Sequence, residues 1–285
     1  MHTGKNEFYI GWMASAPGGI AKHIRKVLYL LVAIVLLTGV ILALQQKKFS
    51  TATFEYGQLT EVRGVYQTFP VPSIKMPSSQ YAFGHTTYLT MPLVGYGKFG
   101  AEGIIAQLEK EKGIKLDGRE CSLKGTLLYS DGKALLQIDQ QDTPLVRLYT
   151  PMPAGSIPSH EIKELGNVEL KGEILDPKCY FGVMKPGSGQ PHRDCAIRCI
   201  EGGMSPVLAV QDSLGHSGYY LLLDENGKKM NDVLKDYIAE PVSLRARAVQ
   251  YDDWIVLYIK GRENIHRISG LSLAKGDAIL RSCAK

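Results

Sequence analysis

Hydrophobic and polar positions divide the chain into one long apolar run and a region of short alternating segments. Residues 27–44 read VLYLLVAIVLLTGVILAL, eighteen positions without a charge. At about 1.5 Å per residue, a helix of this length nearly spans a bilayer's hydrocarbon core. A cleaved signal peptide is the alternative, but its apolar region is typically about 7–15 residues, and QQKKFS follows the run where a small-residue cleavage site is expected. We therefore predict an uncleaved transmembrane helix at 27–45.

Beyond residue 50, a pattern of alternating apolar and polar residues occurs twice. SLKGTLLYSDGKALLQI at 122–138 aligns without a gap with SLRARAVQYDDWIVLYI at 243–259. Each copy alternates, turns at an Asp-containing step and continues as a more apolar strand, which is typical of a β-hairpin. A helical pattern precedes each copy, at 101–113 and at 230–239. The repeat predicts two related units.

The second unit shows the more complete order of elements. Strand patterns at 167–177, 205–213 and 218–227 precede its helix and hairpin. The order of three strands, a helix and two strands resembles the five-stranded OB barrel. The first unit has strand patterns near 58–68 and 86–94, which suggests a looser version, and an unrelated small barrel or sandwich is the alternative.

The predicted fold class is mainly β with short helices (α+β): an N-terminal transmembrane helix followed by two small OB-like β-barrel domains. The predicted boundaries are a cytoplasmic segment at 1–26, the transmembrane helix at 27–45, a first β domain at 50–160, a second β domain at 166–262 and a tail at 263–285.

A segment rich in proline, glycine and aromatic residues runs from 65 to 100 within the first unit. Long irregular segments of this kind are often functional or docking surfaces. The alternative is that the aromatic side chains only cover the barrel. The candidate interaction surface consists of Tyr66, Phe69, Tyr81, Phe83, Tyr96 and Phe99.

Charged residues flank the apolar run unequally. Four basic residues precede it and two, Lys47 and Lys48, follow it. Because basic residues resist translocation, we expect a single-pass protein of a bacterial inner membrane, with a cytoplasmic N-terminus and with residues 46–285 in the periplasm. The net charge of +5 arises before residue 50, where six basic residues face one acidic residue, and the remaining 27 basic and 27 acidic residues balance. This balance predicts no nucleic-acid partner, since such binding usually requires a positive surface.

The stretch PHRDCAIRCI at 191–200 carries the strongest chemical signal. It places His192, Cys195 and Cys199 within eight residues, and Cys179 lies upstream in DPKCYFG. On a helix these three side chains share one face, and the Gly/Pro-rich connection lets Cys179 fold back to join them. Three cysteines and one histidine are an accepted tetrahedral zinc set, and soft sulfur ligands also suit Cu(I). We therefore predict a zinc or copper site formed by these four residues.

An oxidising compartment favours a competing interpretation. A disulfide of Cys179 with Cys195 or Cys199 would close a loop of roughly 17–21 residues and stabilise the fold by about 3 kcal/mol. Thiol redox chemistry and unreactive buried thiols are further alternatives. The chain has no C-x-x-C pair and no C-x-x-C-H haem attachment motif, which disfavours thiol exchange and bound c-type haem.

The cysteine segment resembles one found in bacterial exported or membrane-anchored proteins of uncharacterised activity. Those proteins carry a strand ending in D-x-x-C-Y, a glycine-rich loop and then H-x-x-C-A-x-x-C-I, and the likeness covers residues 172–208. It implies a location and a site but no reaction.

Motifs of the common enzyme classes do not occur in the sequence: there is no G-x-S-x-G, Walker loop, dinucleotide fingerprint or H-E-x-x-H. We predict no catalytic residue. The favoured hypothesis is a non-enzymatic accessory subunit of an inner-membrane complex, respiratory or otherwise redox-active, with other membrane proteins as partners. The alternative hypothesis is a periplasmic protein that carries or inserts copper, zinc or haem.

Overall fold

The computed structural model describes residues 18–45, 52–82, 85–139, 144–150, 160–211 and 217–269. The chain divides into two compact units, Met1–Lys48 and Phe49–Lys285.

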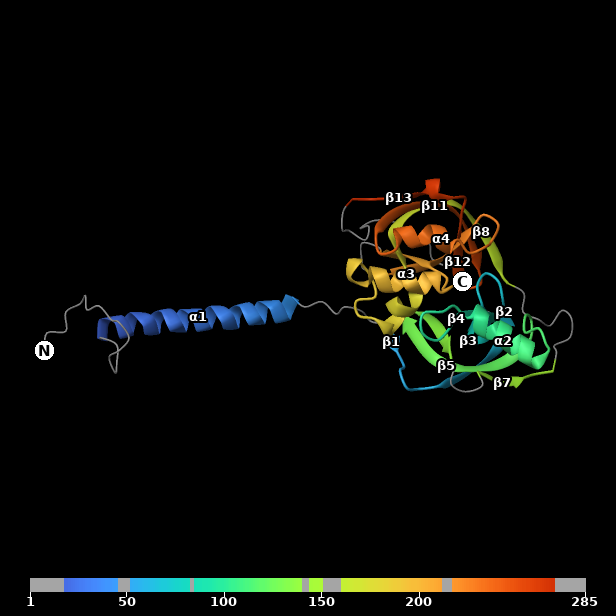
Figure 1. Ribbon diagram of the computed structural model, residues 1–285, viewed down its shortest axis with the longest axis horizontal. Coiled ribbons are helices and arrows are strands. Elements are labelled where there is room, and N and C mark those ends of the chain that lie inside the picture. The colour runs from blue at the N-terminus through green and yellow to red at the C-terminus, as the bar shows by residue number, and fades with distance from the viewer. Residues whose placement is uncertain are drawn as a thin grey trace. The chain divides into compact units, whose positions relative to one another are not determined.

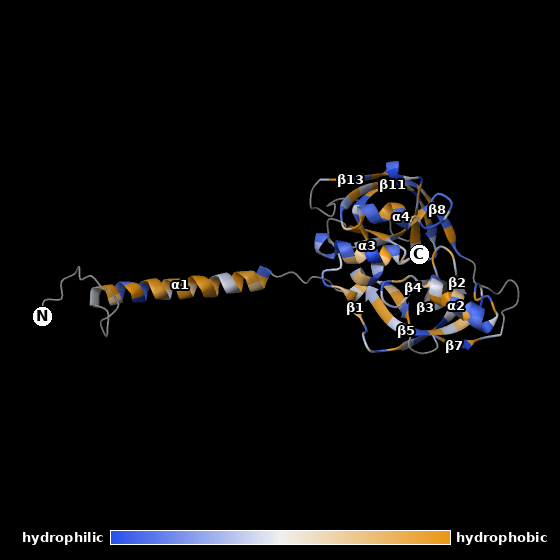
Figure 2. Cartoon of the chain, in the orientation of Figure 1, coloured by the Kyte–Doolittle hydropathy of each residue, from blue (hydrophilic) through white to orange (hydrophobic). Residues whose placement is uncertain are grey.

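The described part of the first unit is one helix, α1 (Gly18–Gln45). It is long and apolar enough to cross a membrane, and Figure 2 shows hydrophobic residues along most of its length. Its 28 residues correspond to about 42 Å of helix, against about 30 Å for a hydrocarbon core. None of them is buried within the protein. The helix begins at Gly18 and so contains the predicted span at 27–45, which is consistent with single-pass anchoring.

The second unit is mainly β, and its first sheet closes on itself. Strands β2, β3, β4, β6 and β5 pair in that order, and β5 pairs back to β2. Of these pairings only β4 with β6 is parallel. The two short strands β1 and β7 pair along β5. The elements are β1 (Thr53–Phe54), β2 (Thr60–Gln67), β3 (Ser73–Ala82), β4 (His85–Val94), α2 (Glu102–Lys112), β5 (Glu120–Ser130), β6 (Lys133–Ile138) and β7 (Leu145–Leu148).

The second sheet, drawn above the first in Figure 1, repeats this order of pairing. Strands β8, β9, β10, β12 and β11 pair in order, β11 pairs back to β8, and β10 with β12 is the parallel pair. A further short strand, β13, pairs antiparallel with β11. The elements are β8 (Ile162–Leu175), β9 (Val207–Gln211), β10 (Ser217–Asp224), α4 (Asn231–Leu234) with a following 3-10 turn (Lys235–Tyr237), β11 (Pro241–Tyr251), β12 (Trp254–Ile259), a 3-10 turn (Arg262–Asn264) and β13 (Ile265–Arg267).

The two predicted hairpins are confirmed as β5–β6 and β11–β12. Each turns at an aspartate with a left-handed backbone, Asp131 with φ 47° and Asp252 with φ 54°. Tight hairpin turns require positive φ, and Asp tolerates it better than most residues. The repeated Asp-containing step therefore sets the position of both turns.

The segment at 65–100 is more regular than its composition suggests. It contains β3 and β4, which pair as antiparallel neighbours with a register shift between Pro77 and Tyr81. The expectation of a long irregular segment is thus corrected. The sequence gives no clear strand pattern for β3, because proline and serine interrupt the alternation of apolar and polar residues. Proline within a strand is tolerated at such irregularities, where no ladder hydrogen bond is lost.

Glycines at one equivalent position allow the first strand of each sheet to approach its neighbour. A Cβ on Gly64 of β2 would lie 2.5 Å from the Lys75 carbonyl oxygen of β3, and a Cβ on Gly172 of β8 would lie 2.3 Å from that of Ala209 in β9. Both distances are shorter than any real carbon–oxygen contact. Each sheet closes tightly because these positions carry no side chain.

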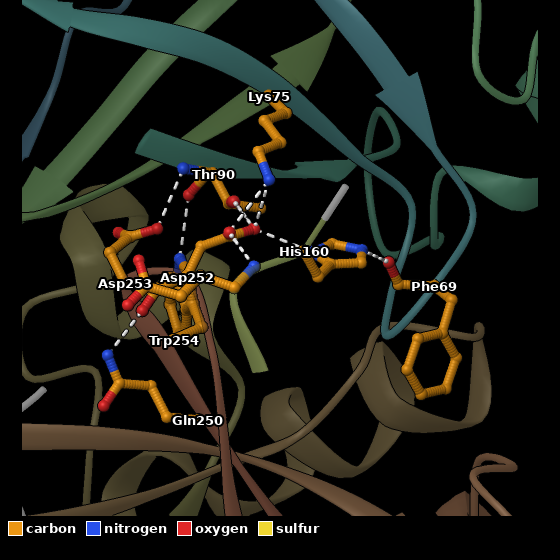
Figure 3. Close-up of polar contacts among 9 residues, drawn as sticks. Phe69, Lys75, Thr90, His160, Gln250, Asp252, Asp253 and Trp254 are labelled. Carbon is orange, nitrogen blue, oxygen red and sulfur yellow. Dashed lines mark hydrogen bonds and ion pairs between the residues drawn. The ribbon is translucent and has the colours of Figure 1, made fainter. Parts of the chain in front are cut away.

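A buried polar cluster joins the two sheets (Figure 3). The Asp252 carboxylate accepts hydrogen bonds from Lys75 Nζ at 2.8 and 2.9 Å, and its Oδ2 lies 2.7 Å from His160 Nδ1. The side chains of Lys75 and Asp252 are 0% and 5% exposed. Trp254 Nε1 donates to the Thr90 carbonyl at 2.8 Å. The turn of the second sheet's hairpin is therefore held by strands β3 and β4 of the first.

The turn of the first hairpin makes the reciprocal contact. Tyr219 of β10 donates its hydroxyl to Asp131 at 2.8 Å, while Thr90 of β4 donates to Asp252 at 3.4 Å. The parallel pairings place Thr90 and Tyr219 at equivalent positions of the two sheets. Apolar packing continues the contact, since Val94 and Leu128 of the first sheet belong to the second sheet's core cluster. The two sheets thus form one compact unit.

Candidate metal centre

The predicted metal ligands lie in a segment inserted between β8 and β9. A short π-helix, η1 (Cys179–Val183), follows β8, and a 3-10 turn, η2 (Gln190–His192), leads into α3 (Arg193–Glu201). The helix on which the shared face of these side chains depends is present as α3, but His192 is its N-cap and precedes its first turn.

The fold places the four predicted ligands in two groups that share Cys179. The Sγ atoms of Cys179, Cys195 and Cys199 lie within 4.8 Å of one another. A second group with the same spacing contains a carboxylate oxygen of Asp176, the Cys179 sulfur and a ring nitrogen of His192. Cys179 belongs to both groups and is therefore the centre of the cluster.

Most of the cluster is buried, and burial favours the neutral forms of Cys179 and His192. Cys179, His192 and Cys199 are 4%, 2% and 1% exposed, whereas Cys195 is partly exposed. A hydrogen bond with Cys199, together with burial, raises the pKa of the Cys179 thiol. Burial lowers the pKa of His192. A neutral imidazole is the ligand form of histidine, and thiols become ligands when an incoming metal displaces their protons.

Three buried side-chain atoms in the cluster have no hydrogen-bond partner among the described residues. They are Nδ1 and Nε2 of His192 and Oδ2 of Asp176. The other Asp176 oxygen, Oδ1, accepts from the backbone amides of Lys178 at 2.9 Å and Cys179 at 3.4 Å. Buried polar atoms without a partner are rare and call for a physical explanation, of which an ion is one.

Two lysines connect this cluster to the first sheet. Lys98, in the loop between β4 and α2, donates from Nζ to the Cys195 sulfur at 2.8 Å and to its carbonyl at 3.4 Å. Lys178, next to Cys179, extends toward the same loop and donates from Nζ to the carbonyl groups of Gly95 at 2.8 Å and Gly97 at 2.6 Å. The loop therefore packs against the edge of the cluster at Cys195.

The electrostatic environment of the two lysines differs. Its hydrogen bond with Cys195 raises the pKa of Lys98, so this ammonium remains charged beside the sulfur. Burial lowers the pKa of Lys178.

Sequence reasoning missed Asp176, Lys98 and Lys178. Asp176 and Lys178 stand beside Cys179 in the motif DPKCYFG, but the sequence alone does not indicate a role for either side chain. Lys98 carries no local signal, because only the contact between the sheets brings it to Cys195.

The described cysteines carry free thiols, including Cys121. Cys121 is 0% exposed in the core of the first sheet, and burial raises the pKa of its thiol to about 12. Cys283 lies outside the described residues. The predicted disulfide of Cys179 with Cys195 or Cys199 stays a prediction, since the same proximity suits a bond or an ion.

The aromatic residues of the candidate interaction surface separate into buried and exposed ones. Tyr66 is 1% exposed and belongs to the first sheet's core. Its side chain therefore fills the interior of that sheet and is not available to a partner. Phe69 is 39% exposed, and its ring stacks edge-on against Tyr251 with centroids 5.3 Å apart. Phe69 therefore supports the contact between the sheets.

Tyr96 and Phe99 are more exposed than Phe69, at 49% and 63%. They flank Lys98 on the loop that packs against Cys195. Phe83 and the side chain of Tyr81 lie outside the described part of the structure.

This arrangement offers a cysteine cluster that could hold a metal ion. Three thiols lie together, and an imidazole and a carboxylate lie beside Cys179, which are ligand types found in metal sites. No protein-family model, no curated protein sequence and no solved structure matches the chain significantly.

Proposed function

We propose that this protein is a membrane-anchored accessory protein whose β unit holds one soft transition-metal ion through Cys179, His192, Cys195 and Cys199. The carrying observation is His192, which is 2% exposed and whose ring nitrogens have no partner among the described residues. A histidine packed only for its shape would leave two desolvated polar atoms uncompensated. An ion bound to one nitrogen removes the larger part of that penalty.

Zinc fits this ligand set best. Three cysteines and one histidine form a closed structural zinc site, whereas Cu(I) is satisfied by two or three sulfurs and does not need the imidazole. The ion would join η1, η2 and α3, which have little regular hydrogen bonding among them. Its role would be to stabilise the inserted segment and the loop packed against it.

We further propose that the two closed sheets are tandem OB-like barrels. In each sheet the strand order is first, second, third, fifth and fourth, the third and fifth strands are parallel, and a helix lies between the third and fourth. This is the connectivity of the five-stranded OB barrel. Such barrels are often binding modules, and here they would form the exterior part of an inner-membrane complex, with residues 46–285 in the periplasm and other membrane proteins as partners.

Metal content and thiol count test the metal proposal together. The full chain is purified in detergent without added reductant, exchanged into metal-free buffer, loaded with zinc and analysed by mass spectrometry for bound metal. One zinc per chain, with all five cysteines reactive after denaturation in chelator, supports the proposal. No bound zinc and only three reactive thiols would establish the disulfide instead.

Two cysteine variants give a matched comparison. Cys199→Ser should abolish tight zinc binding, because it removes a buried ligand. Cys121→Ala removes an equally buried thiol from the first sheet's core and should keep one zinc per chain. Equal zinc content in the two variants would contradict the assignment of the site.

A metal-handling role is the second candidate, and the partial exposure of Cys195 favours it. Among the described cluster thiols, Cys195 is the one that reaches the surface, so an exchanging ligand could approach there. Transfer of zinc or Cu(I) to a small chelator within seconds, with no loss of folded structure, would indicate metal handling. Slow loss that accompanies unfolding would indicate a structural ion.

A further inference from the structure

Asp176 is the least explained group beside the candidate metal centre. Its side chain is 0% exposed and Oδ2 has no partner among the described residues. Oδ1 is fixed by the backbone amides of Lys178 and Cys179, so the carboxylate is held in one orientation without the second oxygen being used. A buried carboxylate held in this way is expected to have a specific partner for each oxygen.

His192 carries the complementary unused hydrogen-bonding groups. A neutral imidazole has one acceptor nitrogen and one N–H donor. Neither ring nitrogen has a partner in the described part of the chain, and one of them lies within 4.8 Å of both an Asp176 oxygen and the Cys179 sulfur. One ring therefore carries two unused functions, and one of its nitrogens lies near both a carboxylate oxygen and the Cys179 sulfur.

We propose that Asp176 is the positioning residue of the metal centre: one nitrogen of His192 binds the ion, and the opposite N–H donates to Oδ2 of Asp176. This inference rests on the proposed function, since it needs an ion on the ring. It accounts for all three unpartnered atoms with one ion and one hydrogen bond. A carboxylate behind a ligating histidine fixes the ring's tautomer and orientation and increases its basicity as a ligand.

The charge around the cluster is consistent with this arrangement. Three thiolates and a neutral imidazole around Zn²⁺ carry a net charge of −1, and Asp176 adds another negative charge. Lys98 lies 2.8 Å from the Cys195 sulfur, and the Lys178 ammonium packs nearby against two carbonyl groups. These two lysines can balance the loaded centre, which otherwise would bury uncompensated charge.

Zinc affinity of the full chain in detergent, measured by competition with a chromogenic chelator, tests the role of Asp176. Asp176→Asn keeps the side chain's shape and should weaken zinc binding about 10- to 100-fold, the usual effect of removing such an outer partner. His192→Ala should weaken it further, because it removes a ligand. Asp117→Asn is the control: Asp117 accepts from the amide and hydroxyl of Thr68 in the first sheet, and its loss should leave zinc affinity unchanged.

A spectroscopic measurement keeps the test independent of folding defects. In the zinc-loaded wild type, nitrogen-15 NMR of the histidine rings should show His192 as a single tautomer with a slowly exchanging N–H proton. Asp176→Asn should shift that proton and accelerate its exchange while the visible spectrum of the Co²⁺ derivative keeps its tetrahedral ligand set.

The outcomes separate this inference from the proposed function. Zinc binding by the wild type with unchanged affinity in Asp176→Asn would overturn the role of Asp176 and leave the metal centre intact. A changed Co²⁺ ligand set in Asp176→Asn, with affinity retained in His192→Ala, would overturn it too, because Asp176 would then be a direct ligand. Failure of the wild type to bind zinc would refute the metal centre itself.

Discussion

Replacing Asp252 by asparagine should weaken the contact between the two sheets more than any surface change. Asp252 accepts both Lys75 hydrogen bonds and the amide of Glu161 at 2.9 Å, and it lies against His160. Asparagine preserves the shape and one acceptor oxygen but removes the negative charge. Lys75, whose side chain is 0% exposed, then loses its carboxylate partner in a place that water does not reach.

The expected cost follows from the burial of this pair. Removing one partner of a buried ion pair typically costs about 3–5 kcal/mol, because a charge stays behind uncompensated. The side chain introduced by Asp252→Asn would still accept one hydrogen bond, so we expect the lower end, about 3 kcal/mol. For a chain of this size, about 2–4 °C per kcal/mol makes the loss in Tm about 6–12 °C.

Trp254 provides the assay, because it is 2% exposed and bonded to Thr90 within the same cluster. The sequence contains one other tryptophan, Trp12, so a Trp12→Phe background isolates the signal. Urea unfolding of the full chain in detergent, followed by Trp254 fluorescence, gives the free energy of unfolding. Glu169→Gln serves as the surface control: it breaks an exposed pair with Arg245 and should cost no more than about 1 kcal/mol.

A double variant decides whether the buried charge is the cause. Lys75→Met combined with Asp252→Asn should be less destabilised than Asp252→Asn alone, since the uncompensated ammonium is gone. A loss below about 1 kcal/mol in the single variant, or a double variant equal to the sum of the single ones, would refute the reasoning.

Three further predictions concern acid unfolding, two glycines and the orientation of the chain. Burial opposes ionisation of Asp252, but hydrogen bonds to its carboxylate outweigh this effect and hold its pKa below the ordinary value. The stabilisation by this carboxylate is therefore present above the unfolded pKa of about 3.9 and is lost as pH falls below it. The free energy of unfolding should accordingly fall less steeply with decreasing pH in Asp252→Asn than in the wild type. Gly172→Ala should cost about 1–3 kcal/mol, because its Cβ would strike the Ala209 carbonyl. In contrast, Gly103→Ala in α2 meets open space and should stabilise by about 0.5–1 kcal/mol in the same urea assay. Alkaline phosphatase fused after residue 285 should be active in bacterial cells, and an inactive, stably expressed fusion would contradict the proposed orientation.

The sequence predicts those elements whose patterns are local. The β5–β6 and β11–β12 hairpins follow from alternation and from the Asp-containing turns, and α1 follows from eighteen uncharged positions. Strand β3 could not be predicted in this way, because it is formed by pairing with β4 rather than by a clear alternation of its own. Pro77 interrupts its pattern at a register shift. A strand stabilised mainly by its neighbours leaves little signal in its own residues.

The candidate metal centre also has a part that the sequence predicts and a part that it does not. Cys195 and Cys199 are one helical turn apart, so their shared face could be predicted from spacing. Lys98 lies in the β4–α2 loop, nearly a hundred residues away, and its approach to Cys195 depends on how this loop packs against α3. Contacts of this kind depend on tertiary structure that no local pattern encodes.

The sequence repeat has a structural meaning that the alignment alone did not supply. In the ungapped alignment Lys133 corresponds to Trp254, and in the structure the Lys133 ammonium lies 4.7 Å from the Trp254 ring. Equivalent residues of two copies touch each other only near an axis that relates the copies by a half-turn. The reciprocal contacts of Asp131 with Tyr219 and of Asp252 with Thr90 obey the same relation. In both repeats the turn of the hairpin thus contacts the other sheet, while the ion pair with Lys75 and the candidate metal ligands distinguish the repeats.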